Sequence, residues 1–344
     1  MVNQSKKIIM IIITFVFLAL GNPSLSNVAT APEGNFGVKA VLPENQIDKN
    51  LGYFDLLVTP KQEQTLDVVL SNSAKNTRTF EVSVNPAVTS DGGTIDYGQK
   101  DAKLDKTIPF DTREAVTVEH SEYQVPGKSD ITIPIKVQLP DTQFKGRVLA
   151  GVHVSPKDEE KTKQSTEGNS VSIKNKIGYN LAIVLQQSQE KVSPDLKMLE
   201  SKVAAINAAP NIQLHFQNPA STIISDLVFK SKVYLNDKLY LENTSNPYLV
   251  APNTNFHLNL DLNKTKAEPG NYRLEVTAKD NKDHTWRFTQ SFTVKKEAAD
   301  TVNKHSILPK EKNDSWVVIL LAVLLIAALV VIIYLLLKRR KKEE

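Results

Sequence analysis

The sequence predicts an all-β protein: two tandem immunoglobulin-like β-sandwich domains followed by one C-terminal transmembrane α-helix. Three observations lead there. Apolar and polar residues alternate with period two between residues 36 and 294, which is typical of half-buried strands. Turn signals such as Asp91-Gly92-Gly93 and Pro269-Gly270 separate the alternating runs at regular spacing. A 22-residue run without charge lies near the C-terminus.

The first 27 residues are predicted to be an export signal peptide. Lys6 and Lys7 precede an apolar run from 8 to 20, which has the length of a signal-peptide core and is too short to cross a bilayer. Small residues at Ser24 and Ser26 favour cleavage after Ser26, with Ala29 as an alternative. The mature chain is therefore expected outside the cytoplasm.

Residues 36–156 are predicted to form the first domain. Its clearest strand alternates at Ile131, Ile133, Ile135, Val137 and Leu139. Pro134 lies inside this strand and removes one backbone donor, so the strand is expected at a sheet edge or with a bulge. A second alternating run covers 148–154.

Residues 165–296 are predicted to form the second domain. The polar segment 156–170 before it is either a linker or the loop of a long hairpin. In the hairpin alternative, the strand at 176–186 pairs back onto 148–154 and packs on the first domain.

A weak internal repeat supports two similar domains. The runs Val69–Asn72 and His215–Asn218 each end a strand in asparagine. Downstream, Val125-Pro126-Gly127-Lys128 and Val250-Ala251-Pro252-Asn253 each open an alternating strand. Similarity imposed by β architecture alone remains the alternative explanation.

The C-terminal part is predicted to be a stalk at 297–315, a membrane span at 316–337 and a cytoplasmic tail at 338–344. The span is long enough for a ~30 Å hydrocarbon core. Aromatic rings near its ends and basic residues after it set the topology, with the C-terminus inside. The residues that carry this prediction are Trp316, Tyr334, Lys338, Arg339, Arg340, Lys341 and Lys342. Leu308-Pro309 is not followed by the Thr-Gly bond that sortases cleave, so retention in the membrane is expected.

Charge and cysteine content exclude several classes of function. The net charge of +4 arises from the two ends, because seven of the 42 basic residues flank the apolar runs. The exported part is close to neutral, so nucleic acid is not an expected partner. The chain has no cysteine, which excludes disulfides, thiolate metal sites and cysteine nucleophiles.

No constellation of catalytic, cofactor-binding or metal-ligating residues is evident, and the chain is not expected to be an enzyme. Phosphate-loop, nucleophile-elbow and zinc-binding histidine motifs are absent from the sequence. His153, His215 and His257 occupy the polar phase of strands and are interpreted as solvent-facing. Asp280–Asp283 lacks the glycine and terminal glutamate of a calcium loop and is interpreted as a hairpin turn.

Short motifs along nearly the whole chain resemble those of the WxL-interacting proteins of low-GC Gram-positive bacteria. In the first domain they are Phe36–Gln46, Gly52–Leu56, Gly93–Tyr97 and Phe144–Gly151. In the second they are Ala251–Phe256, Pro269–Tyr272 and Trp286–Phe288. Ala150-Gly151 departs from the Gly-Gly that is frequent in the family.

The resemblance implies a first domain that binds peptidoglycan, a second that contacts host proteins, and partnership with surface proteins that carry a WxL domain. The chain has no Trp-x-Leu motif itself. The expected location is the cell membrane, crossed once, with the ectodomain in the cell-wall zone. Two alternatives remain: a membrane-held extracytoplasmic folding or assembly factor, and a cell-wall hydrolase.

Overall fold

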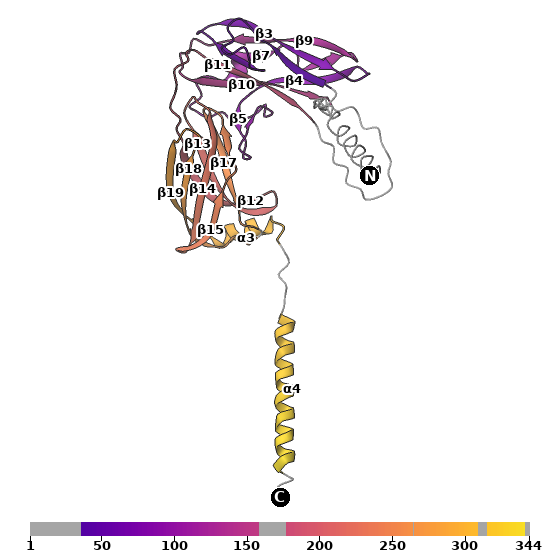
Figure 1. The fold of residues 1–344 in the computed structure, drawn as a ribbon, viewed down its shortest axis with the longest axis vertical. Coiled ribbons are helices and arrows are strands. Elements are labelled where there is room, and N and C mark those ends of the chain that lie inside the picture. Colours follow the sequence, from indigo (N-terminus) through magenta and orange to yellow (C-terminus); the bar gives the residue numbers. More distant parts are fainter. Residues whose placement is uncertain (1–35, 158–176, 264, 309–314, 341–344) are drawn as a thin grey trace, which may run out of the picture. The chain divides into compact units, whose positions relative to one another are not determined.

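A computed structural model of the chain describes residues 36–157, 177–263, 265–308 and 315–340 (Figure 1). The predicted signal peptide lies outside the described residues. The chain divides into two compact units. The first holds the chain up to Lys197 together with Gln217–Asp226 and Tyr248–Phe256; the second holds Met198–Phe216, Leu227–Pro247 and the chain from His257 onward. Strands dominate both units, as the sequence predicted.

The first unit consists of two sheets. One has the order β1-β3-β9-β7, formed by Phe36–Val41, Glu63–Asn72, Ser129–Gln138 and Val116–Val118. The other has the order β2-β11-β10-β4-β8, formed by Phe54–Leu57, Tyr179–Gln186, Arg147–Pro156, Arg78–Pro86 and Glu122–Val125. A small hairpin, β5 (Val88–Thr89) with β6 (Ile95–Asp96), and the short helix α2 (Thr112–Ala115) complete it.

One hydrophobic core lies between these two sheets. Strand β9 contributes Ile133, Ile135 and Val137, whereas strand β10 contributes Val152 and Val154, all at most 2% exposed. These are the apolar positions of the period-two pattern, so the alternation identified both the strands and the inward face. The residues between them point outward.

Strand β11 pairs antiparallel with β10, from Arg147↔Gln186 to Val154↔Tyr179, and parallel with β2. This is the hairpin arrangement that the sequence left open. Residues 179–186 therefore belong physically to the first unit, although the sequence placed them within the range of the second domain.

Strand β9 is an inner strand of its sheet, between β3 and β7, and its pairing with β3 is continuous. The expectation of an edge strand or a bulge at Pro134 was therefore wrong for the strand as a whole. Pro134 pairs with Asp67 on β3, whereas β7 pairs only with Ile135–Val137. At the proline itself the described ladder is one-sided, because the pairing with β7 ends at Ile135.

The second unit is also built from two sheets. The strands β12 (Lys197–Ile206), β13 (Ala209–Asn218) and β17 (Thr254–Asp261) form one sheet. The other has the order β15-β14-β18-β19, formed by Lys238–Thr244, Ile224–Leu235, Gly270–Lys279 and Thr285–Val294. The short strand β16 (Tyr248–Val250) lies in a segment of the first unit. Aromatic rings fill its interior, where Phe216 lies 4.8 Å from Phe229 and 5.6 Å from Phe288 between ring centroids.

An asparagine clasp closes the end of β3. Asn72 is 1% exposed and donates from Nδ2 to the carbonyl oxygens of Asn76 and Val125, both at 2.9 Å, and of Pro126 at 3.2 Å. Its Oδ1 accepts from the backbone N–H of Ala74 at 3.0 Å. Every polar atom of this buried amide is thus used to join two loops.

The same clasp recurs at the end of β13. Asn218, which is fully buried, donates to the carbonyls of Thr222 and Ala251 and accepts from the N–H of Ala220. In both copies a residue with positive φ shortly after a proline donates its N–H to the loop: Lys128, two residues after Pro126, to Ala74, and Asn253, directly after Pro252, to Ala220. The local offsets match, since each asparagine donates to the carbonyl four residues on and accepts from the N–H two residues on, and this shared geometry is in line with an internal repeat.

Helix α3 (Lys296–Lys304) follows β19, where the sequence suggested an aperiodic stalk beginning at residue 297. Ala299 and Val302, one helical turn apart, are buried, and the Asn303 amide donates to and accepts from the backbone of Ala267. The expectation of coil was wrong for this segment because two apolar residues at helical spacing suffice to dock a short helix in a polar sequence.

Helix α4 (Ser315–Arg340) covers the predicted membrane span. Its side chains are described only at 320–333, where they are exposed. Within the described part of the chain, no helix is long and apolar enough to cross a membrane.

Candidate functional site

A polar groove of about 510 Å³ lies on the first unit, on the face of the β2-β11-β10-β4-β8 sheet that points away from the core. It is lined by Glu81, Val82, Ser83, Lys100, Ser121, Glu122, His153, Ser155 and Gly178. Because buried valines alternate with these residues along β4 and β10, the strand pattern that fills the core also places polar groups on the opposite face.

The sheet register brings the groove residues together. His153 on β10 lies opposite Ser83 on β4 and opposite Asn180 on β11. Two residues along, Ser155 lies opposite Glu81, which in turn lies opposite Glu122 on β8. Three neighbouring strands, β10, β4 and β8, thus contribute polar side chains to the lining.

His153 is held in a defined orientation. Its Nδ1 lies 2.7 Å from Oδ1 of Asn180, so a hydrogen bond through Nδ1 fixes the ring. Gly178 closes over the ring: a Cβ there would lie 2.7 Å from Cε1 of His153. Any larger residue at 178 would displace the imidazole.

Charges of both signs surround the groove. Lys157 donates to both carboxylate oxygens of Glu122, at 2.7 and 2.8 Å, and this hydrogen bond raises the pKa of Lys157. Lys100 and Glu81 contribute a further cation and a further anion to the lining. The groove therefore presents hydrogen-bond donors and acceptors without a dominant charge.

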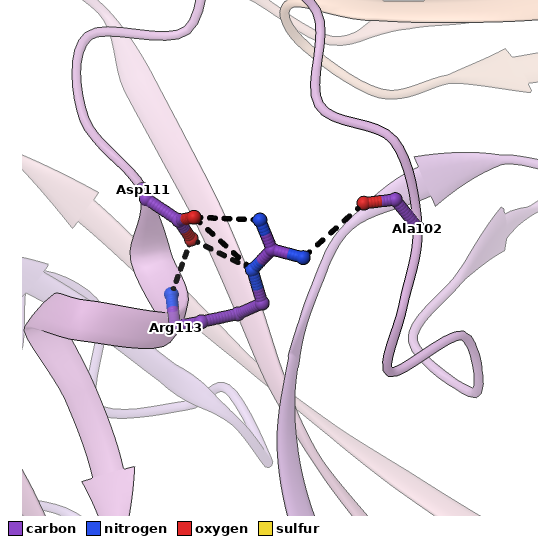
Figure 2. Close-up of polar contacts among 3 residues, drawn as sticks. All are labelled: Ala102, Asp111 and Arg113. Carbon is purple, nitrogen blue, oxygen red and sulfur yellow. Dashed lines mark hydrogen bonds and ion pairs between the residues drawn. The ribbon is translucent and has the colours of Figure 1, made fainter.

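Lys100 is carried by a loop that a clamp holds in place (Figure 2). The Arg113 guanidinium contacts both oxygens of Asp111, with Nη2–Oδ2 at 2.6 Å and Nε–Oδ1 at 2.9 Å, and Nη1 donates to the carbonyl of Ala102. Asp111 also accepts from the backbone N–H of Arg113, and these hydrogen bonds hold the pKa of Asp111 below its usual range. The clamp fixes the chain two residues beyond Lys100.

A second anchor, Asp105, holds the middle of the same loop. It accepts from Oγ1 and N of Thr107, from Nε2 of Gln217 at 2.8 Å and from Nδ2 of Asn255 at 2.5 Å. Partial burial acts to raise the pKa of Asp105, but these hydrogen bonds outweigh it and the pKa is lowered. Asn253 adds a bond from Nδ2 to the carbonyl of Thr107.

Tyr97 packs flat on Gly151, beside the groove strand β10. A Cβ at Gly151 would lie 2.5 Å from the Tyr97 ring, so glycine is required for this contact. The backbone carbonyl of Tyr97 accepts from Nδ2 of buried Asn85 at 2.7 Å, and burial raises the pKa of the Tyr97 hydroxyl. Tyr97 and Gly151 lie in two of the motifs on which the family resemblance rests, and in the structure these two motifs are in contact.

The groove side chains are hydrogen-bonding groups held by the sheet. His153 is oriented by an amide instead of a carboxylate, and its register neighbour Ser83 is an ordinary strand residue. In the part of the chain that the structure describes, no group of three or more His, Asp or Glu side chains is placed to hold a metal ion. The groove presents hydroxyl, imidazole, carboxylate and ammonium groups, which can bond to a ligand rich in hydroxyl and amide groups.

The structure describes most of the residues that the sequence analysis singled out. Trp316, Tyr334 and Lys338–Arg340 lie in α4, whereas Lys341 and Lys342 are outside the described residues. Of the histidines interpreted as solvent-facing, His153 lines the groove, and His215 lies 5.0 Å from His257 between ring centroids. The groove itself was missed, because its residues come from separate strands and a loop.

Two family models match the chain. The model of the WxL Interacting Protein peptidoglycan binding domain matches residues 36–156, and that of the WxL Interacting Protein host binding domain matches residues 168–304. The groove lies on the first unit and draws all but Gly178 from the first matched range. The second range includes β11, which the structure pairs into the first unit.

No curated protein matches the chain. Similar solved structures include the Salmonella enterica SafA pilin in complex with the SafB chaperone, at 10% identity and a TM-score of 0.29, covering 69% of this chain and 98% of that one. The E. coli chaperone DraB matches at 9% identity and a TM-score of 0.29, covering 76% and 95%. PapD-like domain 7 of human CEP192 matches at 11% identity and a TM-score of 0.27, covering 50% and 95%. Similarity at these TM-scores carries no argument.

Proposed function

This chain belongs to the WxL-interacting protein family, and from that premise we propose that the polar groove of its first unit is the peptidoglycan-binding site. The family's peptidoglycan-binding and host-binding domains make it a surface binding protein. The observation that carries the location is the row of His153, Ser155, Glu81 and Lys100 in one open groove. Wall polymer offers hydroxyl, N-acetyl, amino and carboxylate groups, each of which has a partner type there.

The test is retention of the full-length protein, in detergent, on washed sacculi. Ser83→Trp fills the groove from a position outside the core, and we expect at least a tenfold loss of retention. Lys100→Gln removes the groove cation, and the matched control Lys136→Gln removes an exposed lysine on the other sheet. Unchanged retention by a folded Ser83→Trp protein would place the site elsewhere, and release of soluble muropeptides would revive the hydrolase alternative.

We propose that the protein is anchored in the cell membrane by residues 316–337, with the ectodomain in the cell-wall zone and the tail 338–344 in the cytoplasm. The uncharged run, its basic flank and the exposed apolar side chains at 320–333 of α4 support this. After muramidase treatment and fractionation, the protein should stay in the membrane pellet. Its release with wall fragments would contradict the anchor.

We propose that WxL-domain surface proteins are partners and that both units are immunoglobulin-like sandwiches. The family membership supports the partnership, and a pair of sheets in each unit supports the fold assignment. Because the ectodomain is close to neutral, binding should weaken only modestly with added salt, since screening acts on exposed charges. Capture of a purified WxL domain by the full-length protein at low and high salt tests this account.

A further inference from the structure

Strand β19 is a long open edge of the second unit (Figure 1). It pairs with β18 without interruption from Lys279↔Thr285 to Gly270↔Val294, and it is the last strand in its sheet. Among the described residues, no further strand pairs with it. Alternate N–H and C=O groups along ten residues are therefore available to another strand.

This edge lacks the features by which proteins usually protect edges from pairing. Between Thr285 and Val294 there is no proline, lysine or acidic residue, and Arg287 is the one charge. The register has no bulge. By contrast, the opposite edge β15 has a register irregularity at Val233/Tyr234 and carries charged residues such as Glu242. An edge of this length with a regular register and a single charge is the kind that accepts a strand.

The other edges are short, charged or already covered. Strand β7 has three residues and β8 has four. The outer side of β2 is occupied by the preceding segment, where Ile47 donates to the Asp55 carbonyl and Leu57 to the Asn45 carbonyl. Strand β12 carries charged side chains at 197, 200 and 202, and β1 carries one at 39. On β17, the inward side chains are almost fully buried, with Phe256, Leu258 and Leu260 at most 3% exposed.

The inward face of β19, by contrast, is incompletely covered. Trp286, Phe288 and Phe292 point into the unit but are only half-buried. Phe288 meets Phe216 edge to face, and Phe292 stacks on Tyr272 at 5.2 Å. A strand added beside β19 would extend the sheet, and its own inward side chains would cover these rings.

We propose that β19 is the docking edge for an extended segment of a WxL-domain surface protein, which adds to this sheet as a further strand. The proposal rests on the partnership proposed above. The half-buried aromatic row requires apolar side chains at alternate positions of the incoming segment. The outward row of Thr285, Thr289, Ser291 and Thr293 requires polar ones between them. With Arg287 as the single charge, an acidic residue opposite it gives complementarity.

Gln290 marks the position at which strand addition can be blocked. Its side chain points inward, where Oε1 accepts from Oγ of Ser201 at 2.6 Å and Nε2 donates to the Leu199 carbonyl at 3.1 Å, both on β12. A lysine here is an inward-pointing charge on an edge strand, a device that natural proteins use against pairing. Thr289→Lys adds the same charge one residue away on the outward face and is the matched control.

The experiment uses the full-length protein in detergent and a purified WxL domain as the probe. We expect wild type and Thr289→Lys to bind within twofold of one another, and Gln290→Lys to bind at least tenfold more weakly. Amide hydrogen exchange should slow across residues 285–294 when the probe is bound. Circular dichroism and thermal melts establish that both variants remain folded.

The other outcomes contradict either the docking edge, the partner or both. Binding by wild type with no protection at 285–294 and no effect of Gln290→Lys overturns the edge assignment and leaves the partnership intact. No binding by wild type overturns the partnership and the edge assignment with it. A wild-type dimer that Gln290→Lys converts to monomer identifies a second copy of this chain as the occupant and overturns the assignment to a WxL protein.

Discussion

Replacing the buried Asn72 by alanine should destabilise the first unit. The side chain is 1% exposed and makes four polar contacts: its two N–H groups are shared among three carbonyl oxygens, and Oδ1 accepts one hydrogen bond. A net ~0.5–1 kcal/mol for each bond gives roughly 2–4 kcal/mol. The buried carbonyl of Val125 and the N–H of Ala74 lose a partner, which places the estimate toward the upper end.

The assay is denaturant unfolding of the full-length protein in detergent, with a thermal melt alongside. A loss of roughly 2–4 kcal/mol corresponds to a fall of roughly 4–16 °C in the melting temperature of a unit of this size. Asn76→Ala is the matched control, because the Asn76 side chain is exposed and its backbone carbonyl, which accepts from Asn72, is kept. It should change stability by less than about 0.5 kcal/mol.

Asn72→Asp separates donation from acceptance. The carboxylate still accepts from Ala74 but faces carbonyl oxygens that lie 2.9 Å from the present Nδ2. Ionisation is therefore disfavoured in the folded state, the pKa of the new carboxyl is raised, and this variant should lose stability as the pH rises. Equal stabilities for Asn72→Ala and Asn76→Ala would refute the clasp as a source of stability.

Two further predictions concern the groove and its loop. Gly151→Ala should cost about 1–3 kcal/mol and shift the near-ultraviolet signal of Tyr97, because the new methyl group would lie 2.5 Å from that ring; an unchanged melt and spectrum would contradict the close packing. The pKa values of Asp105 and Asp111 are lowered, so their ionised forms stabilise the loop above the unfolded pKa of about 3.9, and that stability is lost as the pH falls through the lower folded values. The denaturation midpoint should therefore fall on acidification, and less so in Asp105→Asn; identical pH profiles would count against the Asp105 anchor.

Strands could be predicted from the sequence because one physical constraint, burial of alternate side chains, repeats along them. Ile133, Ile135 and Val137 show it directly: each is apolar in the sequence and at most 2% exposed in the structure. The similar strand ends that suggested an internal repeat have a related cause, since Asn72 and Asn218 are both buried amides that bond to backbone groups two and four residues further on. Local sequence rules of this kind apply even when the neighbouring strands are unknown.

Pro134 and helix α3 show where local rules fail. A proline in a strand predicts one missing ladder bond, but only the length of β7 decides whether the strand is inner or outer at that point. In α3, composition favoured coil, whereas burial of Ala299 and Val302 together with the two Asn303–Ala267 bonds stabilises a helix. In both cases the outcome depends on a partner distant in sequence.

The groove could not be predicted either, because it also depends on partners that are distant in sequence. From the sequence, His153 is predicted to be a solvent-facing strand residue. Only the pairing of its strand with β11 and β4 brings it next to Asn180 and Ser83. Lys100 joins them only because Arg113 and Asp111 fix its loop (Figure 2). The register between neighbouring strands forms such a site, and no single stretch of the sequence contains its residues.

The hydrogen bonds that hold this loop also involve residues from the sequence range of the other domain. Asp105 is held by Gln217 and Asn255, which lie within the sequence range of the host binding domain yet belong to the first compact unit. In the sequence they are ordinary polar residues of strand ends, with no sign that a carboxylate lies against them. Because they hold the loop that carries Lys100, residues assigned by sequence to one domain help to shape the groove of the other. A boundary drawn along the chain therefore divides residues that act on one site.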